Sequence, residues 1–239
     1  MRVNLLGVQI DPFDLGEMVE RIAGYLRGGR SCQVITVNPE FLYNAQGDPS
    51  LRSLAQRADL VTADGIGVVW ACKVAGTPVP ERVTGIDLMM ALARQSVREG
   101  WGIFLLGAAP GVAEAAALKL GEMFPGVNIV GTHHGYFTEA EEGAVVEAVQ
   151  TAKPDLLFVA LGAPRQEEWI DRYLPTIGPA AAVGVGGSFD VLSGKVSRAP
   201  GWVQRLHCEW LYRLLKDPGR WRRQLVLPRF VWLVLRKYK

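Results

Sequence analysis

Hydrophobic positions in the first two hundred residues follow two alternating patterns. Short runs that are apolar at nearly every position are separated by longer stretches in which apolar residues recur every three or four positions. The first pattern predicts strands buried on both faces, and the second predicts amphipathic helices. The expected strands are 3–10, 32–37, 59–63, 102–107, 127–132, 155–162 and 180–187, and the expected helices are 15–26, 86–97, 111–124, 138–150 and 165–174.

Strands that alternate with helices in this way indicate an α/β fold. We expect a Rossmann-like wound, mostly parallel sheet with helices on both faces. The alternation ends near residue 195, and Pro200, the pair Pro218–Gly219 and Pro228 are expected to divide the remainder into about three short helices. The predicted organisation is an α/β core, residues 1–195, followed by a helical appendage, residues 196–239.

Charge is distributed unevenly between these two parts. Residues 196–239 contain eleven Lys and Arg against Glu209 and Asp217, a local charge of +9. Because the whole chain carries +2, residues 1–195 sum to −7. Four of the seven tryptophans, Trp202, Trp210, Trp221 and Trp232, also lie in the appendage. The two regions are therefore expected to have different roles.

The basic, aromatic appendage admits three interpretations. Cations interleaved with Trp and Leu on short helices favour contact with a membrane surface. A structural helical cap stays open, whereas the apolar residues argue against nucleic acid as a partner. No apolar run reaches the roughly 20 residues that span a bilayer, and the three scattered cysteines suit a reducing cytosol. We expect a cytoplasmic protein, peripheral on the inner face of the membrane, with pairing of chains through the apolar tail left open.

Polar residues stand where predicted strands end, which is where open α/β sheets bind ligands. Thr36 and Asn38 follow the second strand, and Asn38 precedes Pro39 as a helix N-cap does. Asp64 ends the third strand in TADGIG and is read either as an N-cap or as a catalytic carboxylate. Arg82, in the proline-bounded loop 77–85, serves no apolar pattern and is a candidate for binding an anion.

Three glycine-containing loops are further candidates. LGAAPG (106–111), with Gly107 and Ala108, links a strand to a helix and suits a phosphate, although an ordinary turn has the same pattern. LGAPRQEEW (161–169) repeats that form with Gly162, Arg165 and Gln166; Arg165 opposes the helix dipole, which indicates a ligand unless the side chain is simply solvated. GGSFDVLSG (186–194) places Asp190 for a base or sugar, or for capping a turn.

Several common chemistries have no matching motif. The chain has no D-x-D, no G-x-S-x-G and no G-x-x-x-x-G-K-[ST], and the pair His133–His134 lacks an evident third ligand. We expect neither a metal nor an organic cofactor. The glycines after Asp64 form an incomplete dinucleotide fingerprint, so a nucleotide-cofactor oxidoreductase is one alternative function. A non-catalytic protein that binds a nucleotide-sugar or a lipid at the membrane is another.

Taken together, the motifs resemble one known family. VITVNPEFLYNA, ADLVTADGIGVVWA, ERVTGIDLM, FLLGAAPGVAE, GYF, LLFVALGAPRQEEWI and GVGGSFDVLSG occur in the order found in the WecG/TagA/CpsF glycosyltransferases. The resemblance covers almost the whole chain. It implies inverting, metal-independent transfer of a sugar, typically N-acetylmannosamine, from a UDP-sugar to an undecaprenyl-diphosphate-linked sugar in the synthesis of teichoic acid and other surface polysaccharides.

The resemblance also implies roles for individual residues. Asp64 corresponds to the family's catalytic aspartate, the general base on the acceptor hydroxyl. Thr36, Asn38, Arg82 and Gln166 fall on other catalytic motif positions. The implied substrate-binding residues are Gly107, Ala108, Tyr136, Gly162, Arg165 and Asp190, and the tail arginines implied for the lipid diphosphate and the membrane are Arg213, Arg220 and Arg223.

Overall fold

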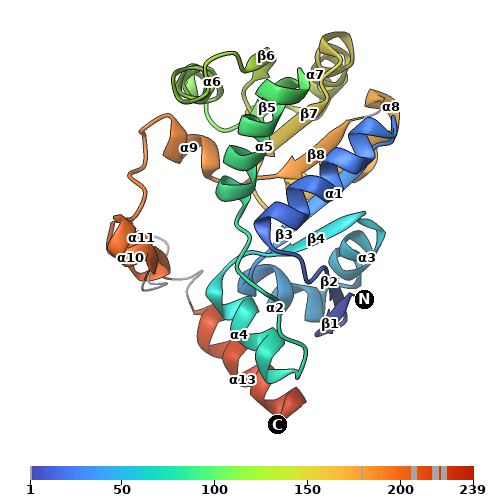
Figure 1. Ribbon diagram of the computed structural model, residues 1–239. Helices are drawn as coiled ribbons and strands as arrows, with labels where there is room; N and C mark the ends of the chain where they lie inside the picture. The colour runs from blue at the N-terminus through green and yellow to red at the C-terminus, as the bar shows by residue number, and fades with distance from the viewer. Residues whose placement is uncertain (1, 179, 206–208, 217–220, 222–224) are drawn as a thin grey trace.

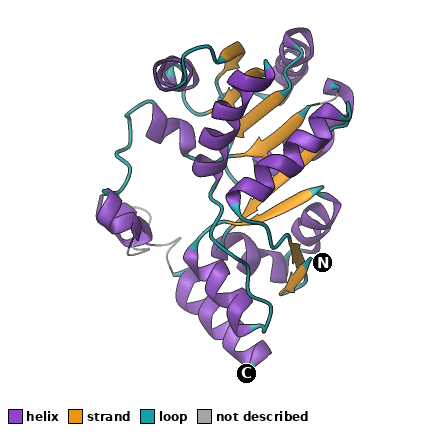
Figure 2. Cartoon of the chain, viewed as in Figure 1, coloured by secondary structure: helices purple, strands orange, loops and turns teal. Residues whose placement is uncertain are grey.

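The computed structural model describes residues 2–178, 180–205, 209–216, 221 and 225–239 (Figure 1). Its centre is a six-stranded sheet in the order β4-β3-β8-β7-β5-β6, in which every neighbouring pair is parallel. Figure 2 shows helices on both faces of this sheet, so the predicted α/β fold is confirmed. The strands are β3 (Cys32–Val37), β4 (Leu60–Ala63), β5 (Gly102–Gly107), β6 (Asn128–His133), β7 (Leu156–Ala160) and β8 (Ala181–Gly184).

The five helices expected from apolar periodicity are present, with ends within three residues of the expected ones. Three short helices that lie beside β3 and β4 were not expected, because their nine residues are too few, and in α4 too uniformly apolar, to display a period of 3.6. The described helices are α1 (Leu15–Arg27), α2 (Pro39–Gly47), α3 (Pro49–Arg57), α4 (Ile66–Val74), α5 (Gly85–Glu99), α6 (Val112–Met123), α7 (Glu139–Ala152), α8 (Arg165–Ile177), α9 (Ser188–Leu192), α10 (Gly201–Arg205), α11 (Glu209–Lys216) and α13 (Val226–Tyr238).

The N-terminal apolar run forms a hairpin and not the single strand expected over residues 3–10. β1 (Val3–Leu5) and β2 (Val8–Ile10) pair antiparallel in a sheet of their own. The two residues between them, Leu6 and Gly7, both have positive φ, 54° and 89°. Positive φ at both central positions is the geometry that two-residue hairpins favour. The turn was not predicted because Leu6–Gly7 lacks the usual turn residues at its first position.

The last helix of the basic appendage packs into the body of the protein. Phe230 and Val234 of α13 are buried in one cluster with residues of α2 and α4, and Figure 1 shows α13 beside α4. Gly67 allows α4 to pack closely against α2, since a Cβ there would come within 2.9 Å of the Pro39 ring. The amide of Leu6 donates to the hydroxyl of Tyr238 at 2.8 Å. The division of the chain at residue 195 remains a proposal. Although α13 belongs to the proposed appendage, it packs against helices of the proposed core.

Pro228 was expected to separate two helices, but it does not. It is the third residue of α13. In the first turn of a helix the backbone N–H has no acceptor within the helix, so proline is tolerated there.

Candidate functional site

The candidate residues gather along the carboxyl edge of the sheet. This edge is formed where β3, β4, β5, β7 and β8 give way to loops and helices. The core residues that lie at or just after these strand ends are Thr36, Asn38, Asp64, Gly107, Ala108, Gly162, Arg165, Gln166 and Asp190. The parallel topology therefore brings together positions that are up to about 150 residues apart in the chain.

A pocket of about 660 Å³ opens at the ends of β5, β7 and β8. Five of the six predicted substrate-binding residues line it, namely Ala108, Tyr136, Gly162, Arg165 and Asp190. The pocket also includes Lys195, whose ammonium lies 3.6 Å from the Asp190 carboxylate. Lys195 was missed because it follows the last glycine loop as an ordinary solvent-exposed cation. The pocket lining therefore contains acidic and basic groups and an exposed aromatic ring.

Gly107, the sixth predicted substrate-binding residue, does not line the pocket. Its lack of a side chain allows the backbone beside the pocket to take its observed path. Its φ is +130°, and a Cβ there would lie 2.5 Å from the carbonyl carbon and oxygen of Ala160. The amide of Ala108 donates to that same carbonyl at 2.9 Å. A side chain at position 107 would therefore push the β5 loop away from β7 and deform the pocket.

Arg165 connects the start of α8 to the loop after β6. Its guanidinium donates to the carbonyls of Gly135 and Phe137, each at 3.3 Å, and lies 4.8 Å from the centre of the Phe137 ring. The Arg165 side chain is therefore not simply solvated, because its guanidinium group is bonded to the protein itself. These contacts hold Tyr136, whose side chain is 73% exposed, at the pocket rim.

Gln166 is buried behind the pocket, where it positions the backbone. Its amide nitrogen donates to Glu167 Oε1 at 2.7 Å, and its carbonyl accepts from the Gly186 amide at 3.1 Å. Gly184 leaves the space for this side chain, since a Cβ there would lie 2.6 Å from its Nε2. Burial raises the pKa of Glu167 from 4.5 to about 7. Gln166 and Glu167 together hold the glycine loop 186–187 that borders the pocket.

Asp64 is not the N-cap of α4. The N-cap is Gly65, with φ 110° and no side-chain cap hydrogen bond. The Asp64 carboxylate instead accepts from the backbone amide of Gly85, at 3.4 Å between N and Oδ2. A Cβ on Gly85 would lie 3.2 Å from the Cα of Val185, the residue before the pocket loop. One glycine thus contacts the candidate carboxylate and approaches the backbone that leads into the pocket loop.

Asn38 is a helix N-cap, as the Asn-Pro pair indicated. Its side-chain oxygen accepts from the Phe41 amide at 2.9 Å, and Pro39 is the first residue of α2. Thr36 joins two strands, because its hydroxyl donates to the Gly184 carbonyl at 3.0 Å. Both side chains therefore fix backbone around the site, whatever further role they have.

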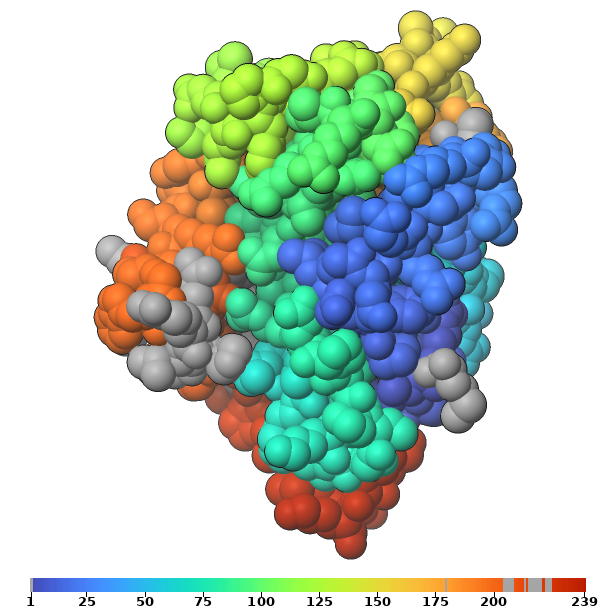
Figure 3. Space-filling view, viewed as in Figure 1, coloured from blue at the N-terminus to red at the C-terminus, as the bar shows by residue number. Residues whose placement is uncertain are grey.

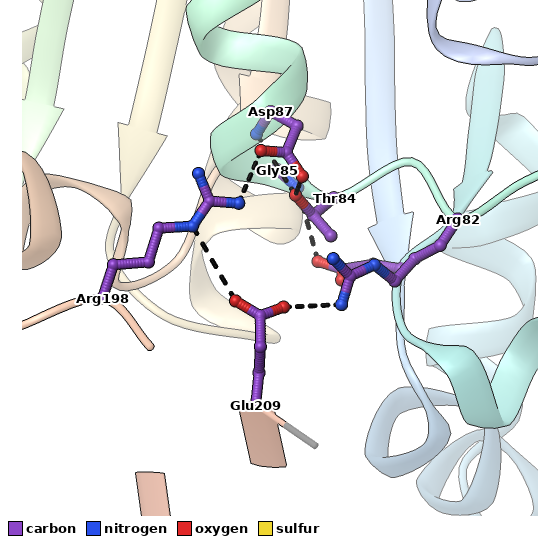
Figure 4. A network of polar contacts seen from close by, with 7 residues as sticks. Arg82, Thr84, Gly85, Asp87, Arg198 and Glu209 are labelled. Atoms are coloured by element: carbon purple, nitrogen blue, oxygen red, sulfur yellow. Dashed lines mark hydrogen bonds and ion pairs between the residues drawn. The ribbon is translucent and has the colours of Figure 1, made fainter. Parts of the chain in front are cut away.

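Arg82 belongs to an ion-pair network that reaches the appendage (Figure 4). Its Nη1 lies 2.5 Å from Glu209 Oε2 at the start of α11. Arg198 lies 3.8 Å from the other oxygen of Glu209 and 2.6 Å from Asp87. Asp87 in turn accepts from the hydroxyl of Thr84. Sequence reasoning singled out only Arg82, because nothing in the spacing relates residues 82–87 to residues 198 and 209.

The appendage presents aromatic side chains to solvent. Trp202, Trp210, Trp221 and Trp232 are each 44% to 62% exposed, and α13, in red, forms the lower end of the molecule in Figure 3. Of the predicted tail arginines, Arg220 and Arg223 lie outside the described residues, and Arg213 is described only by its place in α11. No helix among the described residues is long and apolar enough to cross a membrane.

Over the described ranges, no cluster of three or more His, Cys, Asp or Glu side chains is arranged to hold a metal ion. The rings of His133 and His134 lie 4.7 Å apart, centre to centre, but Nδ1 of His133 is bonded to the carbonyl of His134. His133 is the last residue of β6 and His134 is the first residue of the loop that follows, so the pair shapes the end of this strand.

Comparisons with known proteins identify the family of the chain. Residues 3–239 match the model of the glycosyl transferase WecG/TagA/CpsF family. The chain is 40% identical over 212 residues to an N-acetylglucosaminyldiphosphoundecaprenol N-acetyl-beta-D-mannosaminyltransferase of Bacillus spizizenii, covering 89% of this chain and 82% of the relative. An enzyme of the same name from Staphylococcus aureus is 34% identical, over 98% of this chain and 92% of its own length. The chain belongs to the WecG/TagA/CpsF family and is a glycosyltransferase.

Proposed function

We propose that this enzyme transfers N-acetylmannosamine from a UDP-sugar to N-acetylglucosamine linked to a polyprenyl diphosphate. The names of its relatives supply the transferred sugar and the lipid-linked acceptor. The observation that carries the proposal is the position of Gly85, which contacts both the Asp64 carboxylate and the backbone beside the pocket. A carboxylate beside a nucleotide-sized pocket is the arrangement that sugar transfer needs.

The pocket suits the UDP half of the donor. Tyr136 offers an exposed aromatic face for the uracil ring, and Asp190 offers a carboxylate for sugar or base hydrogens. Phosphate oxygens can accept from backbone amides of the glycine loops at the ends of β5 and β7. Lys195, next to Asp190, adds a positive charge on the same side.

Asp64 is proposed to act as the general base. It removes the proton from the acceptor hydroxyl as that oxygen attacks the anomeric carbon. The bond between this carbon and the UDP oxygen breaks at the same time, and UDP leaves with the electron pair. Attack opposite the leaving group inverts the anomeric configuration.

Arginine side chains are proposed to neutralise the charge that develops on UDP. The sequence lacks the D-x-D motif of metal-dependent transferases, and bidentate guanidinium groups suit phosphate oxygens. Arg82 is one candidate, and the tail arginines Arg213, Arg220 and Arg223 are others that the family resemblance implies.

The appendage is proposed to contact the membrane that carries the acceptor. Its exposed tryptophans lie among exposed cations, such as Arg229, Arg236 and Lys237 of α13. Trp at the headgroup level and cations near anionic lipids are the features of an interfacial contact. Such a contact would place the protein on the cytoplasmic face of the membrane.

A donor screen tests the proposal. The full-length enzyme is incubated with a short-chain polyprenyl diphosphate bearing N-acetylglucosamine and a panel of UDP-sugars, with and without a metal chelator. We expect UDP release with UDP-N-acetylmannosamine in both conditions, and a product one N-acetylhexosamine heavier with the inverted anomer. Transfer of another sugar, retention of configuration, or loss of activity with chelator would each overturn the corresponding part.

A further inference from the structure

Two arginines from distant parts of the chain converge on one carboxylate. Arg82 comes from the loop before α5, Arg198 from the first residues of the appendage, and Glu209 from the first turn of α11 (Figure 4). Glu209 divides its two oxygens between them, with Oε2 2.5 Å from Arg82 and Oε1 3.8 Å from Arg198. The carboxylate therefore lies between the two guanidinium groups.

The Arg82–Glu209 pair is largely shielded from water, and the side chain of Arg198 is 28% exposed. The side chains of Arg82 and Glu209 are 16% and 11% exposed. Nε of Arg198 is buried and has no hydrogen-bond acceptor within the described part of the chain, because 3.8 Å to Glu209 exceeds hydrogen-bond distance. A buried donor without an acceptor is costly and indicates a group that another ligand would satisfy better.

The cluster lies beside the proposed catalytic carboxylate. Asp87, which pairs with Arg198, also accepts from Thr84. The next residue, Gly85, donates its amide to Asp64. Only two residues separate Arg82 from Gly85. An anion held by Arg82 and Arg198 would therefore lie next to the place where sugar transfer is proposed.

We propose that Arg82 and Arg198 form a diphosphate-binding site that the Glu209 carboxylate fills when no substrate is bound. Two guanidinium groups around one small anion match the charge and the several acceptor oxygens of a diphosphate better than those of one carboxylate. Glu209 must leave for the diphosphate to enter, because its negative charge would face the phosphate oxygens at close range. Departure of Glu209 would also release the start of α11 from Arg82.

The inference rests on the proposed function only for the source of the diphosphate, which is UDP on the donor side or the lipid carrier on the acceptor side. Binding measured without turnover tests the diphosphate site separately from the proposed function. A chain that binds diphosphates as described but transfers no sugar would defeat the proposed function and leave this site intact.

The first test removes the negative charge that competes with the ligand. Inorganic pyrophosphate, UDP and a short-chain prenyl diphosphate bearing N-acetylglucosamine are titrated calorimetrically into the full-length wild type and Glu209→Gln. Since an ion-paired hydrogen bond no longer has to be broken, we expect pyrophosphate to bind roughly tenfold more tightly to the variant. Whichever of UDP or the prenyl diphosphate is tightened with it identifies the source. Unchanged or weaker pyrophosphate binding would overturn the proposal.

A second variant changes the arginine that lies outside α11. Arg198→Ala should weaken pyrophosphate binding by about tenfold or more, and Arg198→Lys should restore part of it, because lysine keeps the charge but not the bidentate geometry. The matched control is Glu99→Gln, which removes the partner of Arg27 in a remote ion pair with the same 2.5 Å separation. If Arg198→Ala binds pyrophosphate like the wild type, or if Glu99→Gln tightens binding as much as Glu209→Gln does, the two arginines do not form the site.

Discussion

The backbones of Gly85 and Val185 lie close together beside the glycine loop 186–187 of the pocket. A Cβ on Gly85 would lie 3.2 Å from the Cα of Val185, while the Gly85 amide donates to Asp64. Gly85→Ala should therefore displace the backbone amide that holds the proposed base and lower kcat roughly tenfold, since a misplacement of about 1 Å can cost up to about 100-fold in oriented reactions. Steady-state kinetics measure the change.

The matched control for this substitution is Gly24→Ala in α1, where a Cβ would meet nothing within 4 Å. It should leave kcat unchanged. Equal activity of both variants and the wild type would show that the contact between Gly85 and Val185 does not set the position of Asp64.

Replacing the proposed general base should separate catalysis from binding. Asp64→Asn keeps the size and the acceptor for the Gly85 amide but cannot take a proton, so we expect kcat to fall about 100-fold or more. Calorimetric UDP affinity should remain near the wild-type value. Asp171→Asn, which breaks an exposed pair with Arg57, is the control. Turnover that survives Asp64→Asn would assign the base to another residue.

The buried carboxyl of Glu167 should make stability depend on pH. Its pKa is raised from 4.5 to about 7 by burial, so the folded state holds a proton that the unfolded state has lost. The contribution of Glu167 to the free energy of unfolding is then greatest below pH 4.5 and falls as pH rises to about 7, by roughly 3 kcal/mol in total.

Glu167→Gln keeps the hydrogen bond to Gln166 and removes this titration. Denaturant unfolding between pH 4.5 and 8 should show the variant gaining stability over the wild type as pH rises. Glu168→Gln, at the exposed neighbouring position, should follow the wild type. Parallel curves for Glu167→Gln and the wild type would mean that Glu167 is ionised in the folded protein.

Tyr136 should contribute to donor affinity. Its ring is exposed at the pocket rim, and stacking of a base on an aromatic ring is worth about 1–3 kcal/mol. Tyr136→Ala should weaken UDP binding about tenfold, as measured by calorimetry. Leu118, equally exposed at 73% on α6, gives the control Leu118→Ala. UDP binding that is the same in both variants would place the uracil elsewhere.

Trp232 should contribute to membrane binding. It is 60% exposed on α13, and the guanidinium of Arg236 lies 5.1 Å from its ring centre. Trp232→Ala should reduce co-sedimentation with vesicles containing anionic phospholipid several-fold, because a large apolar side chain is lost from the interface. Leu118→Ala again serves as the control. Unaltered sedimentation would exclude α13 from the contact surface.

Much of the fold followed from local patterns, because each pattern has a local cause. Strands β5, β7 and β8 are apolar on both faces because helices cover both sides of the sheet, and α1 and α5 show their buried stripe in the spacing of Met18, Ile22, Leu88 and Leu92. The Asn38 cap could also be predicted, because the pair Asn38–Pro39 is a local signal for the start of a helix. The hairpin at Leu6–Gly7 was not predicted, because its turn depends on backbone angles that the letters do not display.

The sequence by itself determined the alternation of strands and helices, the residue types at the strand ends, and the concentration of cations and tryptophans after residue 195. Each depends only on neighbours in the chain. Tertiary structure alone decided that Gly65 and not Asp64 caps α4, that Gln166 supports the pocket from behind, and that Arg82 meets Arg198 and Glu209. These relationships arise where parallel strands end side by side and bring distant segments into contact, so no local spacing could encode them.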